Sequence, residues 1–319
     1  MKVLYVGNFS VAHSTESHVA QALEANGVTV DRRQENQVDW TSLARDLGDA
    51  DFVLWTTTND YAPPRTYGAQ RGFLHDCEVP VVSYHLDIWW ELSRQHLIYE
   101  APFFRTDLVV TADGGHDEMW KAAGVNHRWM PPGVSEFECG GGTPRDEYRS
   151  PVAFVGSWNG SYHREHRHRG ELVAWLQRNR DDCAFWPKPG EHAIRNEPLR
   201  DLYASVDVFV GDSCFAGRIA NYHSDRIPEC LGRGGFLLHP VVDGVTDGSL
   251  YVDGEHLRTW RTGDWEALRY LLDHYTEHPE EARAIAEKGR AHVLQHHTYT
   301  VRMRELLALV ATTVPASFA

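Results

Sequence analysis

The amino-acid sequence predicts an α/β fold of two Rossmann-like lobes, each a parallel sheet covered by helices, with a ligand cleft between the lobes. Short β-branched apolar runs alternate with helical patterns, and this alternation indicates parallel strands joined by helices. The alternation starts twice, each time with a strand that ends at a glycine, first Gly7 and then Gly156. A chain of 319 residues also exceeds what one hydrophobic core usually supports.

The composition fits an ordinary globular protein and argues against some partners. Apolar residues make up 42% of the chain and charged residues 24%, both close to globular averages. The formal net charge is −14. Proteins that wrap duplex nucleic acid or lie on anionic membranes use clustered Lys and Arg, so neither partner is expected.

The cysteines and the apolar segments predict a cytoplasmic protein. The five cysteines are scattered and include no CxxC pair, which suits reduced thiols. The first apolar run reaches Gly7 too soon for a signal-peptide core, and no apolar stretch of about 18 residues follows. We therefore expect no membrane span.

The first lobe is expected over residues 1–140, on the acceptor side of the cleft. One helical pattern is capped by Ser14 or Thr15 and runs through Ala25, and a second covers Trp40–Leu47. The expected strands are Lys2–Val6, Val28–Val30, Phe52–Trp55, Val79–Tyr84, Leu108–Thr111 and His127–Met130.

The second lobe is expected over residues 141–298, after a Pro- and Gly-rich stretch near residues 133–149. Residues 299–319 are expected to form a helix that crosses back to the first lobe, with packing on the second lobe as the alternative. The expected elements are strands Val152–Val155, Cys183–Trp186, Val206–Val210 and Gly235–His239, and helices Arg164–Arg178, Leu199–Ser205, Arg226–Gly232 and a tail from Trp265.

The segment Asn221–Pro240 carries the clearest chemistry. Ser224 and Asp225 are positioned to cap a short helix that begins at about Arg226, and a helix start beside an arginine favours an anion. Glu229, just inside that helix, is suited to accept hydrogen bonds from both hydroxyls of a ribose. The alternative is a plain surface pair between Arg226 and Glu229.

This segment resembles the donor-binding element of the "glycosyl transferases group 1" superfamily, and especially of its spore-coat CgeB-like branch. The C-terminal tail resembles that branch too, through the runs His278–Arg283, Ile285-Ala286, Gly289-Arg290 and His297-Thr298-Tyr299. The N-terminal half matches more loosely, through Gly7-Asn8, His85-Leu86-Asp87 and the segments Gly124–Asn126 and Pro131–Val134. The resemblance implies a GT-B fold and sugar transfer from a nucleotide-diphosphate sugar.

One departure from the superfamily pattern concerns the donor sugar. Its members typically carry a second Glu eight positions before the ribose-binding one, and Asn221 stands there in this chain. The resemblance therefore leaves that role to Asn221 or to Asp212. Asp212 and Ser213 follow the strand Val206–Val210, at a strand end where such folds bind ligands. An ordinary turn is the alternative for these two residues.

The basic segment Gly156–Arg169 lies after the first strand of the second lobe. In the superfamily, cations in this region neutralise the donor diphosphate, so the resemblance assigns that charge to Arg164 or Arg167, with Lys188 as a further candidate. Such cations help because the leaving nucleoside diphosphate gains negative charge as the glycosidic bond breaks. A solvated helix face is the alternative. We expect no metal site, although His163 and His166 have ligand-like spacing.

In the first lobe, His85 ends the buried-looking strand VPVVSYH, and the resemblance places it at the donor sugar or the reacting centre. Asp87 is a candidate to accept the proton of an acceptor hydroxyl. A structural histidine at a strand end is the alternative. The loop after the first strand is expected on the acceptor side, by analogy with the superfamily, and includes Gly7, Asn8, Ser14, Thr15 and Glu16.

The sequence therefore predicts a glycosyltransferase that moves a sugar from a nucleotide-diphosphate sugar to an acceptor hydroxyl. The resemblance implies retention of anomeric configuration and catalysis without a metal, and no cofactor is expected besides the donor substrate. Two alternatives stay open, because fold alone does not fix chemistry. One is a non-catalytic nucleotide-sugar-binding protein, and the other is an epimerase or phosphorylase on the same scaffold. No P-loop motif is present to support ATP hydrolysis.

Overall fold

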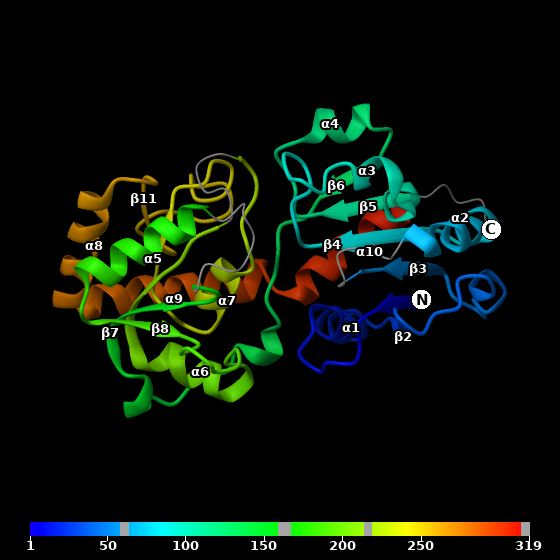
Figure 1. Ribbon diagram of the computed structural model, residues 1–319. Helices are drawn as coiled ribbons and strands as arrows, with labels where there is room; N and C mark the ends of the chain where they lie inside the picture. Colours follow the sequence, from blue (N-terminus) through cyan, green and yellow to red (C-terminus); the bar gives the residue numbers. More distant parts are fainter. Residues whose placement is uncertain (58–63, 159–166, 214–218, 314–319) are drawn as a thin grey trace. The chain divides into compact units, whose positions relative to one another are not determined.

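The computed structural model describes residues 1–57, 64–158, 167–213 and 219–313. The chain divides into two compact units, which are described separately (Figure 1). Unit 1 comprises Met1–Pro131 and Tyr299–Ala319, and unit 2 comprises Pro132–Thr298. The chain passes from unit 1 to unit 2 between Pro131 and Pro132.

Unit 1 is built on a six-stranded sheet with the strand order β2-β1-β3-β4-β5-β6, all parallel. The strands β1, β3, β4 and β5 are almost wholly buried, as expected for a sheet with helices on both faces. The strands are β1 (Lys2–Gly7), β2 (Thr29–Gln34), β3 (Phe52–Trp55), β4 (Val81–His85), β5 (Leu108–Thr111) and β6 (His127–Trp129).

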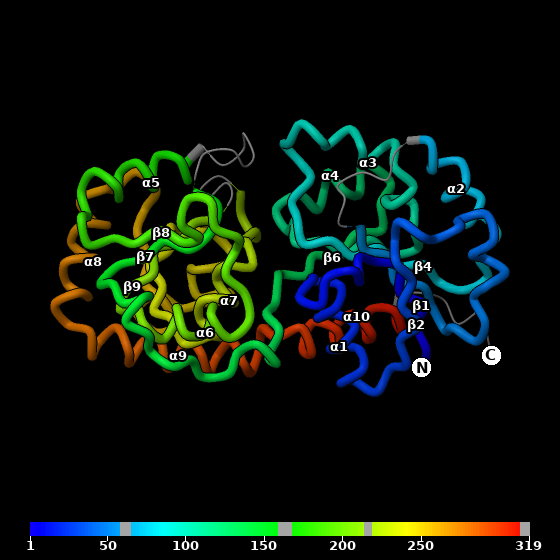
Figure 2. The backbone as a smooth tube through the Cα atoms, turned by 60° about the horizontal axis from the view of Figure 1, so that its bottom comes forward, coloured from blue at the N-terminus to red at the C-terminus, as the bar shows by residue number. Residues whose placement is uncertain are grey.

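Alternate residues of these strands enter two hydrophobic cores on opposite faces of the sheet. Val3 and Tyr5 pack with α1 and α10, whereas Leu4 and Val6 pack with α2 and the segments from α3 to α4. Figure 2 shows α1 and α10 beside each other in unit 1. The helices are α1 (Thr15–Ala25), α2 (Tyr67–Asp76), α3 (Leu97–Glu100), α4 (Asp117–Ala122) and α10 (Tyr299–Thr313), with the 3-10 turns η1 (Leu43–Arg45), η2 (Pro64–Thr66) and η3 (Pro102–Arg105).

Unit 2 contains a five-stranded parallel sheet with the order β11-β10-β9-β7-β8. One face packs against α5 and α8, and the other against α6, α7 and the end of α9 (Figure 1). The strands are β7 (Ser150–Val155), β8 (Cys183–Trp186), β9 (Val206–Val210), β10 (Leu237–Pro240) and β11 (Arg258–Trp260). The helices are α5 (Arg167–Asn179), α6 (Asn196–Ser205), α7 (Arg226–Gly232), α8 (Trp265–Glu277) and α9 (Pro279–His296), with the 3-10 turns η4 (Glu136–Glu138) and η5 (Asp146–Tyr148).

The first and last residues of unit 2 lie next to each other. Val134 and Thr298 form an isolated parallel bridge, and the Val134 amide donates to the His297 carbonyl at 3.0 Å. Gly133 packs directly on this backbone, because a Cβ there would lie 3.1 Å from the His297 oxygen. Helix α10 then returns to unit 1.

The expected helix Trp40–Leu47 is wrong, because only the 3-10 turn η1 forms there. Asp39 explains the difference: its carboxylate accepts the Thr41 amide at 3.0 Å, and its carbonyl accepts the Ser42 and Leu43 amides. Such local bonds compete with a continuous helix. Trp40, Leu43 and Leu47 are still buried, which is why their helix-like spacing misled the prediction.

None of the helices in the described part of the chain has the length and apolar content that crossing a lipid bilayer requires.

Candidate functional site

The candidate site lies at the carboxyl edge of the unit 2 sheet. Strand β7 pairs with β9, and β9 pairs with β10, so the residues that follow these strands are neighbours. Gly156 follows β7, Asp212 and Ser213 follow β9, and Pro240 ends β10. The carboxyl ends of parallel strands are where open α/β sheets bind ligands.

A buried carboxylate, Asp212, anchors two arginines at this edge. The Arg169 Nε lies 3.0 Å from Asp212 Oδ1 and 3.1 Å from Oδ2, and Arg226 Nη1 lies 3.5 Å from Oδ1. Burial opposes ionisation of Asp212, but the two guanidiniums outweigh it and hold the pKa of the carboxyl below its ordinary value. The cluster therefore carries one more positive than negative charge, which suits a small anion.

The Arg226 side chain crosses the ends of β7 and β9. Its guanidinium lies 5.1 Å from the Phe154 ring centroid, and a Cβ on Gly211 would come within 2.8 Å of its Cδ. A Cβ on Gly156 would overlap Arg226 Nη2, and Gly156 has a φ of 136°, which side chains rarely adopt. Glycine is thus required at position 156 for the guanidinium to approach the backbone.

A second network holds the loop that leads into α7. The His239 ring makes two hydrogen bonds. Nδ1 donates to the Pro240 carbonyl at 2.8 Å, and Nε2 lies 3.0 Å from Ser213 Oγ. Burial lowers the pKa of His239 to about 4, so the ring is neutral and Ser213 donates to Nε2. Ser213 Oγ in turn accepts the Ser224 amide at 3.1 Å. Ser213 is therefore a structural link between β10 and the start of α7.

Glu229 lies in the first turn of α7 with 31% of its side chain exposed. Burial and the nearby Asp225 charge raise the pKa of Glu229, while the guanidiniums of Arg233, Arg195 and Arg226 oppose that rise. Arg233 Nη1 lies 4.0 Å from Glu229 Oε1. The Glu229 carboxylate is thus partly open to a ligand and surrounded by cations.

The expected capping of α7 by side chains is not formed. Asp225 is the N-cap residue, but its backbone is helical (φ −53°, ψ −17°) and its side chain makes no capping bond. Ser224 Oγ faces the Asp212 carbonyl instead, at 3.5 Å. The physical reason is that capping by a side chain requires an extended N-cap backbone.

Of the remaining predicted donor residues, two have described side-chain contacts and two do not. Asn221 has a φ of 54°, donates its amide to the Asp243 carbonyl, and packs its side-chain oxygen against Gly244. Lys188 Nζ lies 4.6 Å from the Trp186 ring centroid. Arg164 lies outside the described residues, and Arg167 begins α5 without a described side chain.

Arg169 is the site residue that sequence reasoning missed. Arg169 ends the basic segment, but the family resemblance assigns the diphosphate charge to Arg164 or Arg167 instead. Its position two residues into α5, after the loop that follows β7, is the signal that would have found it. The topology brings this helix start beside the end of β9, where Asp212 lies.

His85 and Asp87 lie at the carboxyl edge of the unit 1 sheet. His85 ends β4 and is buried, and its Nδ1 accepts the Asp87 amide at 3.1 Å. The Asp87 carboxylate is 45% exposed and lies 3.3 Å from Arg94 Nη2. The Trp89 ring packs edge-on against His85, with 5.1 Å between centroids.

The loop after β1 is held by its own polar groups. Ser14 caps α1 by accepting the Ser17 amide at 3.1 Å, and its hydroxyl donates to the Asn8 carbonyl at 2.7 Å. Thr15 begins α1. Glu16 is buried against Gly7, where a Cβ would lie 2.8 Å from Glu16 Cγ.

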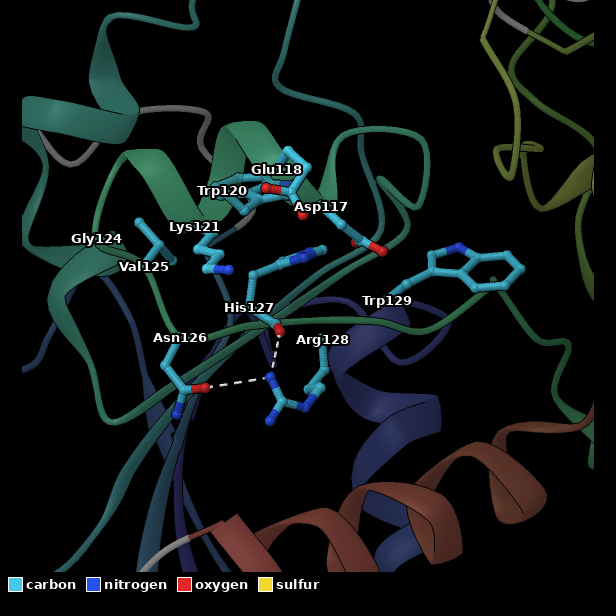
Figure 3. Close-up of a pocket in the computed structure, with 10 residues that line it drawn as sticks. All are labelled: Asp117, Glu118, Trp120, Lys121, Gly124, Val125, Asn126, His127, Arg128 and Trp129. Carbon is cyan, nitrogen blue, oxygen red and sulfur yellow. Dashed lines mark hydrogen bonds between the residues drawn. The ribbon is translucent and has the colours of Figure 1, made fainter.

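A surface pocket of about 530 Å³ lies between α4 and β6 of unit 1 (Figure 3). Its wall combines charged side chains of α4 with Arg128, which donates to the Asn126 side chain at 3.3 Å. Of the predicted site residues whose side chains the structure describes, none lines this pocket. The lining residues are Asp117, Glu118, Trp120, Lys121, Gly124, Val125, Asn126, His127, Arg128 and Trp129.

One Asp-x-Asp sequence, a pattern that can hold a metal, is present at Asp49-Ala50-Asp51. It precedes β3, at the amino edge of the unit 1 sheet. Asp49 pairs with the Lys2 ammonium, and Asp51 accepts the Lys2 amide at 2.6 Å. These carboxylates are therefore tied to β1, at the edge opposite to the predicted ligand sites.

Several solved structures share the fold of this chain. An Anabaena HepE structure in complex with UDP and glucose matches with a TM-score of 0.62 and 12% identity, covering 98% of this chain and 100% of that chain. Sucrose-phosphate synthase from Thermosynechococcus elongatus matches with a TM-score of 0.62, 10% identity and the same coverage. An alpha-glucosyltransferase bound to UDP-glucose and DNA with an abasic site gives 0.64 and 11%, again covering 98% and 100%. The expected GT-B fold is thus confirmed.

A match to a protein-family model identifies the family of the chain, which the fold alone does not. Residues 146–308 match the family described as glycosyl transferase-like, and the chain belongs to this family. The protein is therefore a glycosyltransferase. No curated protein sequence matches the chain.

Proposed function

We propose that the protein transfers a sugar from a nucleotide-diphosphate sugar to an acceptor hydroxyl, with unit 2 as the donor-binding unit. One observation carries the proposal: two arginines meet on one buried carboxylate at the carboxyl edge of the unit 2 sheet. The buried Asp212 carboxylate holds the guanidiniums of Arg169 and Arg226 in fixed orientations. Their remaining N–H groups are therefore positioned before a ligand binds. This arrangement fits a diphosphate.

A uridine nucleotide is the first donor to test. The HepE and alpha-glucosyltransferase structures contain UDP or UDP-glucose. The similarity in fold supports UDP-glucose as a probe for this chain and does not extend to the acceptor.

In the proposed reaction, the bond between the sugar C1 and the β-phosphate oxygen breaks while C1 bonds to the acceptor oxygen. The acceptor hydroxyl gives its proton to the Asp87 carboxylate, and the nucleoside diphosphate leaves with the electron pair of the broken bond. Arg226 and Arg169 stabilise the charge that builds up on the diphosphate, which is how protein cations would take a metal's place. Glu229 accepts the two ribose hydroxyls. This set of roles is supported by the partial exposure of Glu229 and Arg226.

His85 is proposed to face the donor sugar, and Asp87 to receive the acceptor hydroxyl. Retention of anomeric configuration is proposed from the resemblance to the superfamily. Membership of the CgeB-like branch is proposed from the resemblance of Asn221–Pro240 and of the C-terminal tail. A cytoplasmic location is proposed from the scattered cysteines, of which Cys77, Cys139, Cys183 and Cys230 are free thiols.

The test is calorimetric titration of the purified protein with UDP and with GDP, alongside thermal unfolding. Wild type is expected to bind one nucleotide at or below millimolar concentration, and Glu229→Ala is expected to weaken it about tenfold or more through the lost charge-assisted hydrogen bonds. Glu266→Ala is the matched control, because Glu266 is also in the first turn of a helix and is exposed. If neither nucleotide binds wild type at millimolar concentration, the donor-site assignment is wrong.

Asn221 favours one alternative, a nucleotide-sugar-binding protein without turnover. It stands where the superfamily has a second Glu, and its side chain packs against Gly244. Release of UDP from UDP-glucose separates the two functions, because a binder without catalysis shows affinity and no release.

A further inference from the structure

A buried aspartate and histidine pair in unit 1 is not used by the proposed donor site. Asp113 and His116 follow β5, with side-chain exposures of 0% and 7%. His116 Nδ1 lies 2.5 Å from Asp113 Oδ1. Strand β5 is the neighbour of β4, and Thr111 is in register with His85, so the pair lies at the same sheet edge as His85.

Asp113 ties the loop that follows His85 to the end of β5. Its Oδ2 accepts the backbone amides of Trp89 at 3.1 Å and Trp90 at 3.2 Å, while Oδ1 faces His116. Three donors thus compensate one buried carboxylate. Because both amides belong to the loop of residues 86–95, this carboxylate sets the position of the loop backbone.

The inner end of this network is fixed by β5 and β6. The Asp113 amide donates to Thr111 Oγ1 at 3.1 Å, and Thr111 Oγ1 lies 2.8 Å from His127 Nε2. The His127 ring stacks on Trp120 with 4.4 Å between centroids, and Figure 3 shows both side chains between α4 and β6. Burial lowers the pKa of His127 to about 4, so this ring stays neutral.

The outer end of the network carries charge. His116 Nε2 lies 3.6 Å from Glu91 Oε1, and Glu91 holds a φ of 61°, which is uncommon for a residue with a side chain. Burial lowers the pKa of His116, but Asp113 and Glu91 outweigh burial and raise it above the ordinary value. The charged and titratable groups around His116 are Asp113, Glu91 and, from β6, His127. A protonated His116 therefore bridges Asp113 and Glu91.

The loop fixes His85 through two contacts. The Asp87 amide donates to His85 Nδ1, so a neutral His85 carries its hydrogen on Nε2. The Trp89 ring packs against the His85 ring, and Arg94 lies over Trp89 at 4.8 Å. Arg94 also donates to the Ile88 carbonyl, through Nη2 at 2.7 Å. A shift of the Trp89 and Trp90 backbone would thus change both the tautomer and the orientation of His85.

We propose that Asp113 and His116 are positioning residues, which hold the loop of residues 86–95 and thereby keep His85 in the tautomer and orientation used in sugar transfer. This inference rests on the proposed function of His85. It assigns the pair to the chemical step and not to nucleotide binding, because the arginines that fit the diphosphate belong to unit 2. Loss of the pair therefore lowers kcat and leaves nucleotide affinity unchanged.

The test compares Asp113→Asn with wild type in the full chain, using UDP-glucose as substrate with water as acceptor. An asparagine offers a single carbonyl oxygen, so it cannot accept hydrogen bonds from the Trp89 amide, the Trp90 amide and His116 all at once. Its NH2 group turns a donor toward the partner that is left. We expect kcat for UDP release to fall about 10- to 100-fold, as a small displacement of a reacting group can cause. The Kd for UDP and the KM for UDP-glucose should change by less than about twofold. Hydrogen exchange of the Trp89 and Trp90 amides should become faster.

Asp107→Asn is the matched control. Asp107 stands at the other end of β5, and its carboxylate also accepts a backbone amide, that of Val81 at 2.7 Å. The same substitution there should change stability without changing kcat. An equal loss of kcat in both variants would overturn the proposal, because general loosening of the sheet would then explain it.

Glu91→Gln gives a second test. The Glu91 side chain is 61% exposed, so this variant is expected to fold normally. In wild type, kcat should fall as pH rises through the pKa of His116, because the bridge to Glu91 is lost. Removal of the Glu91 charge lowers that pKa, so the falling limb should move to lower pH. An unmoved limb, or unchanged amide exchange and kcat in Asp113→Asn, would overturn the proposal. Absence of UDP binding in wild type would instead overturn the proposed function, and the amide exchange would still test the loop.

Discussion

The carboxyl edges of the two sheets use a buried aspartate in different ways. In unit 2, Asp212 is buried against Arg169 and Arg226, whose guanidiniums remain partly exposed. In unit 1, Asp113 is buried against backbone amides and His116. The exposed carboxylates of the adjoining loop are Asp87, which pairs with Arg94, and Glu91, which faces His116. The first acid orients cations and the second orients backbone.

Under the proposed function, the two edges take different parts of the reaction. Both edges follow from the same parallel-strand geometry, but arginine side chains are partly exposed beside Asp212, whereas the Glu91 carboxylate is exposed beside His116. A diphosphate suits the unit 2 edge, whereas hydroxyl groups suit the unit 1 edge. Function therefore depends on the residues that follow the strands and not on the fold.

Asp212→Asn is expected to have the largest effect, a loss of unfolding free energy. It tests the role of the buried acid in unit 2. Removing one partner of a buried ion pair typically costs about 3–5 kcal/mol, because the remaining charge is left uncompensated. Denaturant unfolding monitored by fluorescence measures the change. The pKa of Asp212 is lowered in the folded state, so its contribution is present above the unfolded value of about 4 and is lost as pH falls below it. In the variant, this acid-side loss should shrink; an unchanged free energy of unfolding would contradict the role of Asp212.

Arg226→Ala should remove one of the two cations proposed to bind the diphosphate, while Arg169 stays paired with Asp212. We expect kcat/KM for UDP-glucose to fall about 10²-fold, as is typical when one group that stabilises transition-state charge is lost. Arg226→Lys keeps the charge but not the planar group and should recover part of the loss. Steady-state UDP release measures both variants, and equal activity of Arg226→Ala and wild type would remove Arg226 from the site.

Gly156→Ala should displace Arg226 without removing it. The added methyl would overlap Nη2 and would need a backbone conformation that costs about 1–3 kcal/mol for residues other than glycine. We expect weaker UDP binding by calorimetry and a lower melting temperature. Gly170→Ala is the control, since a Cβ there meets no atom within 4 Å.

A pH series should separate the two edges. The folded-state pKa of His116 is raised, so its stabilising contribution is full below about pH 6.5 and is lost as pH rises through the folded value. Wild type should therefore lose more unfolding free energy between neutral and alkaline pH than Glu91→Gln does. Urea unfolding at several pH values measures this difference, and parallel curves would show that His116 is not the titrating group.

The smallest effect is expected from Arg149→Ala. Arg149 pairs with Asp146 at 3.5 Å, and both side chains are largely exposed. Surface pairs of this kind contribute about 0–1 kcal/mol, so stability and UDP affinity should stay close to wild type. This variant calibrates the others, because a large effect here would mean that arginine loss in general perturbs the protein.

The repeated α/β pattern was readable from the sequence because buried parallel strands are short β-branched runs. The strand Leu108–Thr111 was predicted with the bounds that the structure shows, and so was the strand Val206–Val210. The helix Tyr67–Asp76 was missed, since its few buried residues, Tyr67, Gln70 and Phe73, give a weak apolar pattern. Segments stabilised by tertiary contacts leave little local signal.

The candidate site was predicted only in part, for a similar reason. Arg226, Glu229 and Asp212 follow from strand ends and from a family-like segment, which are local features. The pairing of Asp212 with Arg169, and of Asp113 with the Trp89 and Trp90 amides, joins residues 43 and 23–24 positions apart in the chain. One sequence does not show which buried acid meets which donor.

Helix α10 has a consequence for how the protein is made. It covers one face of the unit 1 sheet through Tyr299, Met303, Leu306 and Val310, yet it follows all of unit 2 in the chain. During synthesis on the ribosome, the six strands of unit 1 emerge first, with α1 but not yet α10 to cover that face. Unit 2 completes its own core before the sealing helix is translated. A chain cut at the end of the first six strands would therefore expose an apolar surface and aggregate.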